Sequence, residues 1–301
     1  MCGVAGMVDL RGAPDRASLQ NMAASLRHRG PDDSQVAVRD NVGLVHTRLS
    51  IVGLGESGRQ PCIDADGGWS LSFNGEVFNH LELREQLPPC RYIGSGDNET
   101  LLHGLCQKGL DIVPALNGFF AFAAVDHGAR KLYLVRDRFG VKPLYYAIAN
   151  GRMWFASEQK AILAAGFESE VNEELFRYHV ARIWANSPET CLQGIRKLMP
   201  GCVLEVDIDS LDQRRWEWFS LRDLARPEFA TRLAEMPREE GVDLLETAIQ
   251  KAVDRRMASE VPLALLCSGG IDSSLISTLA AQRQAGLCAY VLSVPGYPQW
   301  D

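Results

Sequence analysis

The sequence has no long apolar segment and no excess of positive charge. Its longest apolar runs, such as Phe119 to Val125, are far shorter than the about 20 residues that a membrane-spanning helix requires. With 31 Lys and Arg against 38 Asp and Glu, the formal net charge is −7, whereas non-specific nucleic-acid binding depends on clustered basic side chains. No charged and then apolar leader precedes Gly3. These absences argue against membrane and nucleic-acid partners, and we expect a cytoplasmic protein that binds small molecules.

Paired cysteines and metal-ligand patterns are also missing. The 8 cysteines lie far apart, at positions 2, 62, 90, 106, 191, 202, 267 and 288, without a CxxC pair. None of them has a nearby histidine at the spacing of a zinc site. The sequence therefore predicts no bound metal ion of this kind, and we expect reduced cysteines, most of them filling the core.

The composition is that of a folded protein, with 46% hydrophobic and 23% charged residues in a chain of 301. This length is sufficient for two domains, each with a core of its own. The first half alternates a few amphipathic helices with many β-rich runs, and Asn150-Gly151 between two such runs is a hairpin signal. Asn79 and Glu82 resemble a helix-capping pair, and Asp97 or Asn98 is expected to cap the next helix. These features predict an α+β domain over residues 1–205.

The charged stretch over residues 206–240 lacks a clear period, and we interpret it as a linker or interface segment. Over residues 241–301 a helix with Val242, Leu245, Ile249 and Val253 on one face precedes the strand VPLALLC, a glycine turn, the helix SSLISTLAAQ and the strand AYVLSV. This order is βαβ, the beginning of a parallel α/β domain. Two strands and one crossover helix cannot bury both faces of a parallel sheet, so we expect this second domain to be incomplete as written.

Cys2 is the first candidate for chemistry. Removal of the initiator methionine would leave this cysteine with a free α-amine, whose reference pKa of about 7.7 to 8.0 lies close to the thiol value of about 8.5. The amine could then accept the proton of the thiol near neutral pH, and Cys2 would be nucleophile and base at once. The alternative is a cysteine that merely packs in the first strand.

Eight motifs in a fixed order resemble those of the class II glutamine amidotransferases, which are N-terminal-nucleophile glutaminases. They cover roughly the first 165 residues. In chain order they are CGVAG, RHRGPDD, HTRLSIV, FNGEVFN, SGDNETLL, LNGFFAFAAVD, RDRFGVKPLYY and FASEQKA. Any one of these strings would be weak evidence, but their succession is specific. The resemblance implies an N-terminal-nucleophile hydrolase fold, an αββα sandwich, in which Cys2 attacks the carboxamide of glutamine and forms a γ-glutamyl thioester.

The resemblance also implies roles for individual residues. Arg48 would bind the α-carboxylate of glutamine through its guanidinium fork, and Asp97 would pair with the α-ammonium group. The side chain of Asn74 and the backbone N–H of Gly75 would form the oxyanion hole, with glycine permitting a close approach of the backbone. Arg29 and Asp32 would support the site without a catalytic step. The full set expected to contact glutamine is Arg48, Leu49, Ser50, Ile51, Val52, Asn74, Gly75, Glu76 and Asp97.

Simpler interpretations of these residues exist. Arg48 could be a surface residue at the end of a strand, Asp97 a helix cap, and Asn74-Gly75 an ordinary hairpin turn. A β-rich context on both sides of Asn74-Gly75 favours a strand end at a binding site over a turn.

The segment Leu263 to Leu275, LALLCSGGIDSSL, contains a second motif. It lacks the Gly-Lys-Ser or Gly-Lys-Thr of a Walker A loop. Its pattern SGGxDS resembles the pyrophosphate loop of ATP pyrophosphatase domains, in which backbone N–H groups and a helix N-terminus surround phosphate. A tight turn between a strand and a helix is the simpler alternative. The residues expected to bind ATP are Cys267, Ser268, Gly269, Gly270, Asp272, Ser273, Ser274 and Leu292, and Mg²⁺ would accompany the phosphates.

A glutaminase followed by SGGIDSS is similar to glutamine-hydrolysing asparagine synthetase. In that family ATP adenylates a carboxylate, pyrophosphate leaves, and ammonia from the glutaminase site attacks the acyl-adenylate. The resemblance implies aspartate as the acceptor, with the carboxylate of a sugar or secondary metabolite as the alternative. A third possibility is a non-catalytic sensor of glutamine or nucleotide. Because family members continue beyond this point, we expect either a missing C-terminal synthetase half or self-association, for example as a homodimer.

Overall fold

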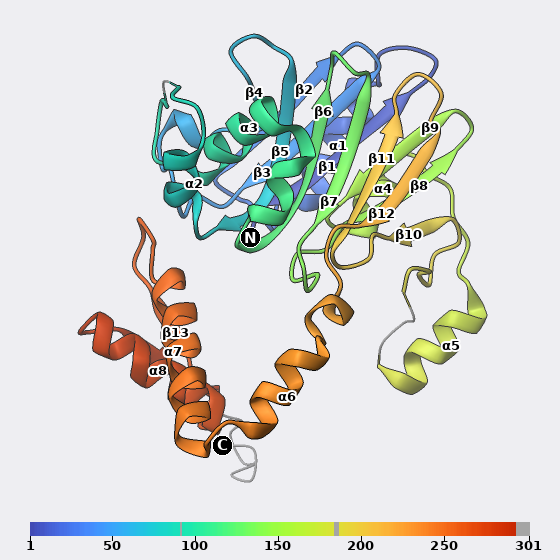
Figure 1. Ribbon diagram of the computed structural model, residues 1–301. Helices are drawn as coiled ribbons and strands as arrows, with labels where there is room; N and C mark the ends of the chain where they lie inside the picture. The colour runs from blue at the N-terminus through green and yellow to red at the C-terminus, as the bar shows by residue number, and fades with distance from the viewer. Residues whose placement is uncertain (91, 184–186, 293–301) are drawn as a thin grey trace. The chain divides into compact units, whose positions relative to one another are not determined.

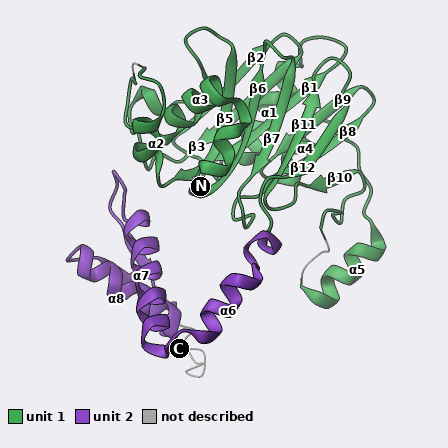
Figure 2. Ribbon diagram, viewed as in Figure 1, with its two compact units in different colours: residues 1–220 green, residues 221–301 purple. Residues whose placement is uncertain are grey.

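The computed structural model describes residues 1–90, 92–183 and 187–292 (Figure 1). The chain forms two compact units, Met1–Ser220 and Leu221–Asp301 (Figure 2). The first unit contains two large antiparallel sheets, and the second contains mainly helices.

The first sheet has six strands in the order β10-β8-β9-β1-β3-β2. The strands are β1 (Gly3–Asp9), β2 (Asp33–Arg39), β3 (Val42–Arg48), β8 (Tyr145–Ala149), β9 (Arg152–Ala156) and β10 (Ile195–Lys197). Helices α1 (Arg16–Leu26) and α4 (Gln159–Ala164) cover one face, because their apolar residues pack on Ala5, Met7 and Val45. The predicted helical face Leu19, Met22, Ala23 and Leu26 is buried there.

The second sheet also has six strands, in the order β12-β11-β7-β6-β5-β4. They are β4 (Cys62–Ile63), β5 (Trp69–Val77), β6 (Gly118–Asp126), β7 (Lys131–Arg136), β11 (Cys202–Asp207) and β12 (Gln213–Glu217). Helices α2 (His80–Gln86) and α3 (Asp97–Lys108) and the 3-10 segment η2 (Gly109–Ala115) pack on its outer face. The remaining elements of this unit are η1 (Glu56–Gly58) and α5 (Glu173–Arg182).

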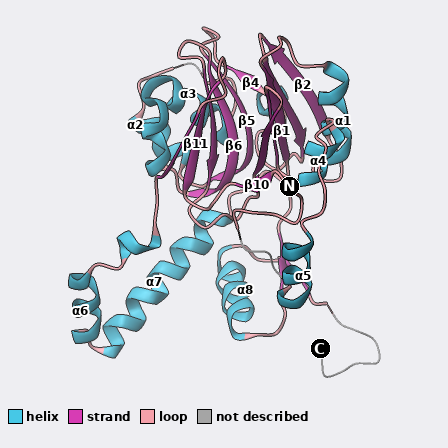
Figure 3. Cartoon of the chain, turned by 90° about the vertical axis from the view of Figure 1, so that its right-hand side faces the viewer, coloured by secondary structure: helices cyan, strands magenta, loops and turns pink. Residues whose placement is uncertain are grey.

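The two sheets face each other, and their inner side chains form the central core. Val4, Val8 and Leu44 of the first sheet pack with Ala121 and Leu134 of the second. Figure 3 shows the four layers, with α1 and α4 outside one sheet and α2 and α3 outside the other. The predicted αββα sandwich is confirmed.

The structure tests the predicted hairpin turn and the predicted helix caps of the first unit. Asn150 and Gly151 both have positive φ, 52° and 71°, and join β8 to β9 as the predicted hairpin. Asn79 is the N-cap residue of α2, as predicted, but its side chain makes no capping hydrogen bond, and the N-cap of α3 is Gly96 rather than Asp97 or Asn98. The side chain of Asn79 accepts the N–H of Asn117 at 2.8 Å and does not cap α2. Asp97 is the first residue of α3, and its carboxylate accepts a hydrogen bond from the Val77 N–H at the end of β5.

The first unit extends further along the chain than residue 205, where the sequence analysis placed its end. β11 pairs with β7 from Val203 to Asp207, and β12 pairs with β11 from Gln213 to Glu217. Trp218 packs its ring parallel to that of Phe120, with the ring centroids 6.1 Å apart. The charged stretch therefore begins with strands of the second sheet.

The second unit contains η3 (Leu221–Leu224), α6 (Pro227–Glu235), α7 (Arg238–Arg256), β13 (Ala264–Leu266), α8 (Ile271–Arg283) and β14 (Cys288–Tyr290). β13 and β14 are parallel and α8 connects them, as the βαβ prediction required. The predicted apolar face of α7 is buried only at its C-terminal end. Val253 is buried, whereas Val242 and Leu245 are 53% and 61% exposed. The end of the predicted strand AYVLSV, from residue 293, lies outside the described residues.

Within the described part of the chain, no helix combines the length and the apolar character needed to cross a membrane.

Candidate active site

Cys2 lies directly before β1, beside the end of β3. Gly3 pairs with Thr47 across the two strands, and a Cβ atom on Gly3 would come within 2.5 Å of the Thr47 hydroxyl, so only glycine permits this approach. The Cys2 thiol lies 3.5 Å from the backbone N of Leu49, which donates to it, and 3.7 Å from the Leu49 carbonyl. Burial raises the pKa of this thiol. A base is therefore needed to make it a nucleophile at neutral pH.

A cavity of about 210 Å³ lies in front of the thiol. Residues from the end of β3, the following loop, the middle of β5 and the start of α3 line it. The predicted residues in its wall are Cys2, Arg48, Leu49, Ile51, Val52, Asn74, Gly75, Glu76 and Asp97, joined by Met1, Gly58, Gln60, Phe73, Asn98, Phe119 and Lys142. Ser50 is not in the wall. The Ser50 N–H donates to the carboxylate of Asp32 at 2.8 Å, and this hydrogen bond holds the loop after β3.

Asn74 is a strand residue with an unused donor. It is 1% exposed, and its Nδ2 atom is buried without a hydrogen-bond partner among the described residues. A buried unpartnered amide costs free energy, roughly 1–3 kcal/mol, unless a ligand uses it. Asn74 and Gly75 are not a hairpin turn, because both pair with β6 in mid-strand.

Gly75 is required for a reason that the sequence analysis did not foresee. A Cβ atom on Gly75 would overlap the Phe119 carbonyl and come within 2.7 Å of the Phe120 Cα on β6. The absence of a side chain therefore allows close strand packing, and this packing places the Gly75 backbone at the cavity wall.

Two residues missed in the sequence, Gln60 and His46, hold β5 in place. The Gln60 side-chain oxygen accepts the N–H of Phe73 at 2.7 Å, and the His46 ring nitrogen Nε2 lies 3.0 Å from the Phe73 carbonyl. Burial lowers the pKa of His46 to about 4, so its ring is neutral and donates to that carbonyl. Both contacts join β5 to segments from the opposite side of the cavity and fix the position of Asn74.

Asp97 is a buried carboxylate at the start of α3. Its Oδ2 atom accepts the N–H of Val77 at 2.8 Å. Burial, together with the charge of Glu76, raises the pKa of Asp97 to about 6, although the Val77 N–H acts in the opposite direction. A cationic ligand group placed here would restore the charged form.

Arg48 uses part of its guanidinium group to order the loop after β3. The side chain is 6% exposed; Nη1 donates to the Gly55 carbonyl at 3.1 Å, and Nη2 donates to the Gly53 carbonyl. Five N–H donors are available on arginine, so donors remain for a carboxylate. The structure thus places Arg48 in the cavity wall and not on the surface.

Lys142 and Arg29 are further cations near the thiol. Lys142 is 8% exposed, stands 4.4 Å from the centroid of the Phe119 ring, and has a pKa lowered by burial. The motif RDRFGVKPLYY contained Lys142, but nothing in the sequence indicated that it enters the cavity. Arg29 does not line the cavity. Its Nε atom donates to the Cys2 carbonyl at 3.0 Å.

The glycine loop of the second unit lies between β13 and α8. Gly269 has φ +77°, and no atom of the described residues lies within 4 Å of the place where its Cβ would be. α8 begins after Gly270 without a side-chain cap, so its first N–H groups remain available for an anion. The Ser268 and Ser273 hydroxyls lie 3.1 Å apart at this turn. The open turn and the uncapped helix fit a phosphate group.

The other residues predicted for ATP lie on both sides of this turn. Cys267 directly follows β13, and its N–H donates to the Tyr290 carbonyl at 2.9 Å. Asp272 and Ser274 lie in the first turn of α8, whereas Leu292 follows β14 and is 87% exposed. Among the described residues, no three His, Cys, Asp or Glu side chains gather as a metal site would require.

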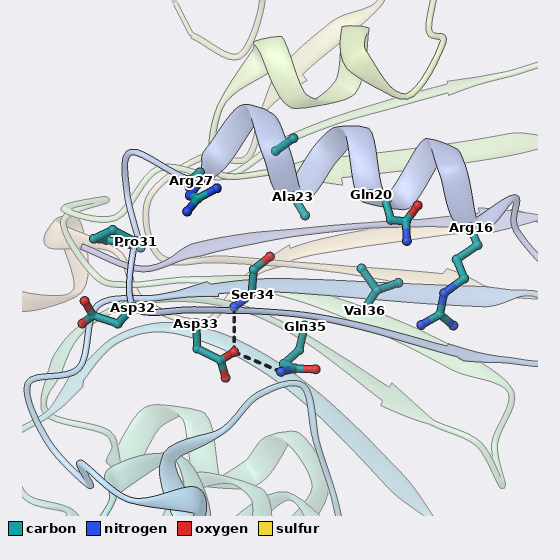
Figure 4. Close-up of a pocket in the computed structure, with 12 residues that line it drawn as sticks. Arg16, Gln20, Ala23, Arg27, Pro31, Asp32, Asp33, Ser34, Gln35 and Val36 are labelled. Carbon is teal, nitrogen blue, oxygen red and sulfur yellow. Dashed lines mark hydrogen bonds between the residues drawn. The ribbon is translucent and has the colours of Figure 1, made fainter.

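A larger hollow of about 610 Å³ lies elsewhere, between α1 and the edge strand β2 (Figure 4). Arg16 and Gln20 line it from α1 and Arg27 from the residue after that helix. Asp33 lines it from β2, where it accepts hydrogen bonds from Ser34 and Gln35. It contains no nucleophile comparable to Cys2, so the smaller cavity is the better candidate for catalysis.

Comparison with known families gives two matches along the chain. A model described as a glutamine amidotransferase domain matches residues 1–217, and one described as asparagine synthase matches residues 244–298.

Several curated relatives are identical to this chain at about a third of the aligned positions. "Asparagine synthetase [glutamine-hydrolyzing] 2" of Bacillus subtilis is 32% identical over 299 residues, covering 94% of this chain and 39% of its own length. A putative asparagine synthetase [glutamine-hydrolyzing] of Mycobacterium bovis is 31% identical over 313 residues, which cover 96% of this chain and 47% of the relative. "Amidase chyE" of Penicillium rubens is 32% identical over 255 residues, with 84% and 37% covered. The chain spans less than half the length of these relatives.

A solved structure supports the fold. The glutamine phosphoribosylpyrophosphate amidotransferase of Bacillus subtilis superposes with a TM-score of 0.54 at 16% identity, covering 96% of this chain and 65% of the other. At this identity the likeness concerns the fold alone.

Proposed function

The chain belongs to the glutamine amidotransferase family, and from this premise we propose that Cys2 hydrolyses glutamine to glutamate and ammonia. The observation that carries the proposal is one cavity in which the Cys2 thiol, the unpartnered Asn74 amide, Arg48 and Asp97 all lie in the wall. A volume of about 210 Å³ suits a small amino acid better than a nucleotide or a polymer.

The reaction begins with the terminal amine. Met1 also lines the cavity, and burial lowers the pKa of its α-amine. Removal of Met1 transfers the terminal amine to Cys2 itself, where the same burial favours the neutral form that can accept a proton. The amine takes the thiol proton, and the thiolate attacks the side-chain carbonyl carbon of glutamine.

The remaining steps follow from the cavity wall. Asn74 Nδ2 and the Gly75 N–H donate to the oxyanion of the tetrahedral intermediate. The protonated amine then gives its proton to the leaving nitrogen, which departs as ammonia and leaves a γ-glutamyl thioester. Water, deprotonated by the same amine, hydrolyses the thioester to glutamate. The Asp97 carboxylate and the free donors of Arg48 hold the α-ammonium and α-carboxylate groups of the substrate, with contributions from Glu76 and the loop 49–52.

We expect the affinity for glutamine to increase with pH through the titration of Asp97. With a pKa of about 6, Asp97 is mostly neutral at pH 5 and mostly charged at pH 7, and only the charged form pairs with the α-ammonium group. The KM for glutamine should therefore fall about tenfold from pH 5 to pH 7. Steady-state kinetics across this range measure the change. Asp97→Asn should raise KM and remove the dependence; a wild-type KM independent of pH would contradict the assignment.

Substitution of Arg48 should also weaken substrate binding. Loss of one partner of a buried charged pair costs about 2–5 kcal/mol, so Arg48→Ala should raise KM by roughly 30-fold or more. Arg48→Lys should rescue little, because lysine cannot replace the fork that binds two loop carbonyls and a carboxylate. Measuring the initial rate as a function of glutamine concentration gives KM for both variants. Equal KM values for wild type and Arg48→Ala would exclude the carboxylate role.

For the second unit we propose ATP-dependent amidation of a carboxylate, with AMP and pyrophosphate as products and with ammonia from the glutaminase reaction as the nitrogen source. The asparagine synthase match over residues 244–298 and the open loop at Gly269 support this. The loop Cys267–Ser274 would hold the phosphates, with Mg²⁺ bound to them, and Leu292 would lie near the base. Photolabelling with an azido derivative of ATP tests the site. If this loop is labelled as strongly in Gly269→Val as in the wild type, the result would contradict the proposed ATP site.

Aspartate is the proposed acceptor, because relatives of this chain are named asparagine synthetases. The second candidate is the carboxylate of a sugar or a secondary metabolite. Pyrophosphate release with MgATP, glutamine and either acceptor distinguishes the two. A non-catalytic sensor would bind glutamine without releasing ammonia.

A further inference from the structure

The motif FASEQKA places two neighbouring residues, Ser157 and Glu158, beside the start of β1. The Ser157 N–H donates to the Val4 carbonyl at 2.8 Å, and its hydroxyl accepts the Val4 N–H at 3.0 Å. Ser157 thus anchors β1 two residues after the nucleophile. Glu158 follows β9, precedes α4 and does not line the cavity.

Arg29 connects Glu158 to the nucleophile. Its Nη1 atom donates to Glu158 Oε1 at 2.8 Å, while its Nε atom donates to the carbonyl of Cys2 at 3.0 Å. The Arg29 side chain is 8% exposed, and its Nη2 atom is buried without a partner among the described residues. A single guanidinium group therefore joins a carboxylate from residue 158 to the backbone of residue 2.

Glu158 is well suited to hold this arginine. Two further side chains contact the same carboxylate, His28 through Nε2 at 2.9 Å and Lys160 through Nζ at 3.1 Å. Burial acts to raise the pKa of Glu158, but the hydrogen bonds from Arg29, His28 and Lys160 lower it to about 2. The carboxylate is charged throughout the range in which the amine and the thiol of Cys2 react.

An N-terminal nucleophile has a particular need for such a contact. Once Met1 is removed, no peptide bond precedes Cys2, and a chain terminus is poorly ordered unless other groups hold it. The carbonyl of Cys2 is the backbone group through which the protein can orient the amine and the thiol together. A displacement of about 1 Å in a reacting group can cost about a hundredfold in rate.

We propose that Glu158 is a positioning residue for the nucleophile: it holds the Arg29 guanidinium against the Cys2 carbonyl and touches neither the substrate nor the thiol. The inference rests on the proposed glutaminase function of Cys2. Its distinguishing feature is a mechanism through Arg29, so Glu158 should affect turnover and not glutamine binding.

Glu158→Gln tests this directly. We expect kcat for glutamine hydrolysis to fall roughly 10- to 100-fold, with KM within about threefold of wild type, because the residues proposed to bind glutamine lie on other segments. Lys160→Met is the matched control, since it removes an ion pair from the same carboxylate without reaching Arg29 or Cys2. Its kcat should stay within about twofold of wild type. An unchanged kcat in Glu158→Gln, or a change in KM alone, would overturn the inference.

A double variant separates positioning from a general loss of stability. If Glu158 acts through Arg29, Arg29→Met alone should show the full loss of kcat. Adding Glu158→Gln to Arg29→Met should then lower kcat no further. A double variant whose loss of kcat is the product of the two single losses would overturn the proposal. Glu158→Asp, which keeps the charge but withdraws it by one methylene, should show an intermediate kcat and provides the test if Glu158→Gln fails to fold. Wild-type protein without glutaminase activity would refute the proposed function itself, whereas an active wild type with an unaffected Glu158→Gln refutes only this inference.

Discussion

Glutamine hydrolysis should be lost when Cys2 is replaced by serine, with kcat reduced roughly 10⁴-fold or more, as is usual when a nucleophile is removed. The hydroxyl of serine has a far higher pKa than a thiol, so the α-amine activates it much less readily at neutral pH in a site built for a thiol. The substitution removes one buried sulfur atom and should leave the fold intact. Ammonia release, with mass spectrometry to confirm removal of Met1, measures the effect. A serine variant as fast as wild type would refute the assignment.

Cys62→Ser is the control for this experiment. Burial raises the pKa of Cys62 to about 12, its Sγ atom donates to the Leu71 carbonyl at 3.7 Å, and Cys62 does not line the cavity. This variant should therefore retain activity. A diazoketone analogue of glutamine should label Cys2 and none of the other cysteines, because labelling follows thiolate formation in the site. Equal labelling of an exposed cysteine such as Cys90 would show that accessibility, and not activation, governs the reaction.

Replacing Asn74 with alanine should lower kcat by roughly 10² to 10³, the usual loss for one oxyanion donor, with a smaller effect on KM. The Nδ2 atom has no partner in the described residues of the free protein, so its donor is available to the transition state. Steady-state kinetics separate the two parameters. A change in KM alone would show that Asn74 binds the ground state of the substrate and would remove it from the oxyanion hole.

The same substitution makes a distinctive prediction about stability. Because the Nδ2 atom is buried and unpartnered, Asn74→Ala eliminates no hydrogen bond made by that atom and removes an uncompensated donor. The thermal unfolding midpoint should therefore stay close to that of wild type or rise. Phe73→Ala, a core truncation at the preceding position of the same strand, is a useful contrast. It should lower stability by about 3–5 kcal/mol.

Local features of the fold could be predicted where the physics is local. The apolar spacing of Leu19 to Leu26 predicted α1, and Asn150-Gly151 predicted the hairpin, because such signals depend on neighbouring residues. The predicted capping hydrogen bonds do not form, for the opposite reason. Asn79 and Asp97 are good capping residues, but backbone N–H groups from distant positions donate to their side-chain oxygens. Asn117 donates to Asn79, and Val77 donates to Asp97.

The sequence by itself determined the family resemblance, the αββα class, the βαβ order around SGGIDSS, and nine of the 16 residues in the cavity wall. Each of these depends on motifs or periodicity that the chain carries in order. Only the tertiary structure decided how the site is held. Arg29 and Glu158 are 129 positions apart, and the close packing of Gly75 on β6 leaves no room for a side chain there. Likewise, burial and not residue type brings the pKa of Asp97 to about 6. Burial and contacts between distant segments arise only when the two sheets pack together, so no local pattern reports them.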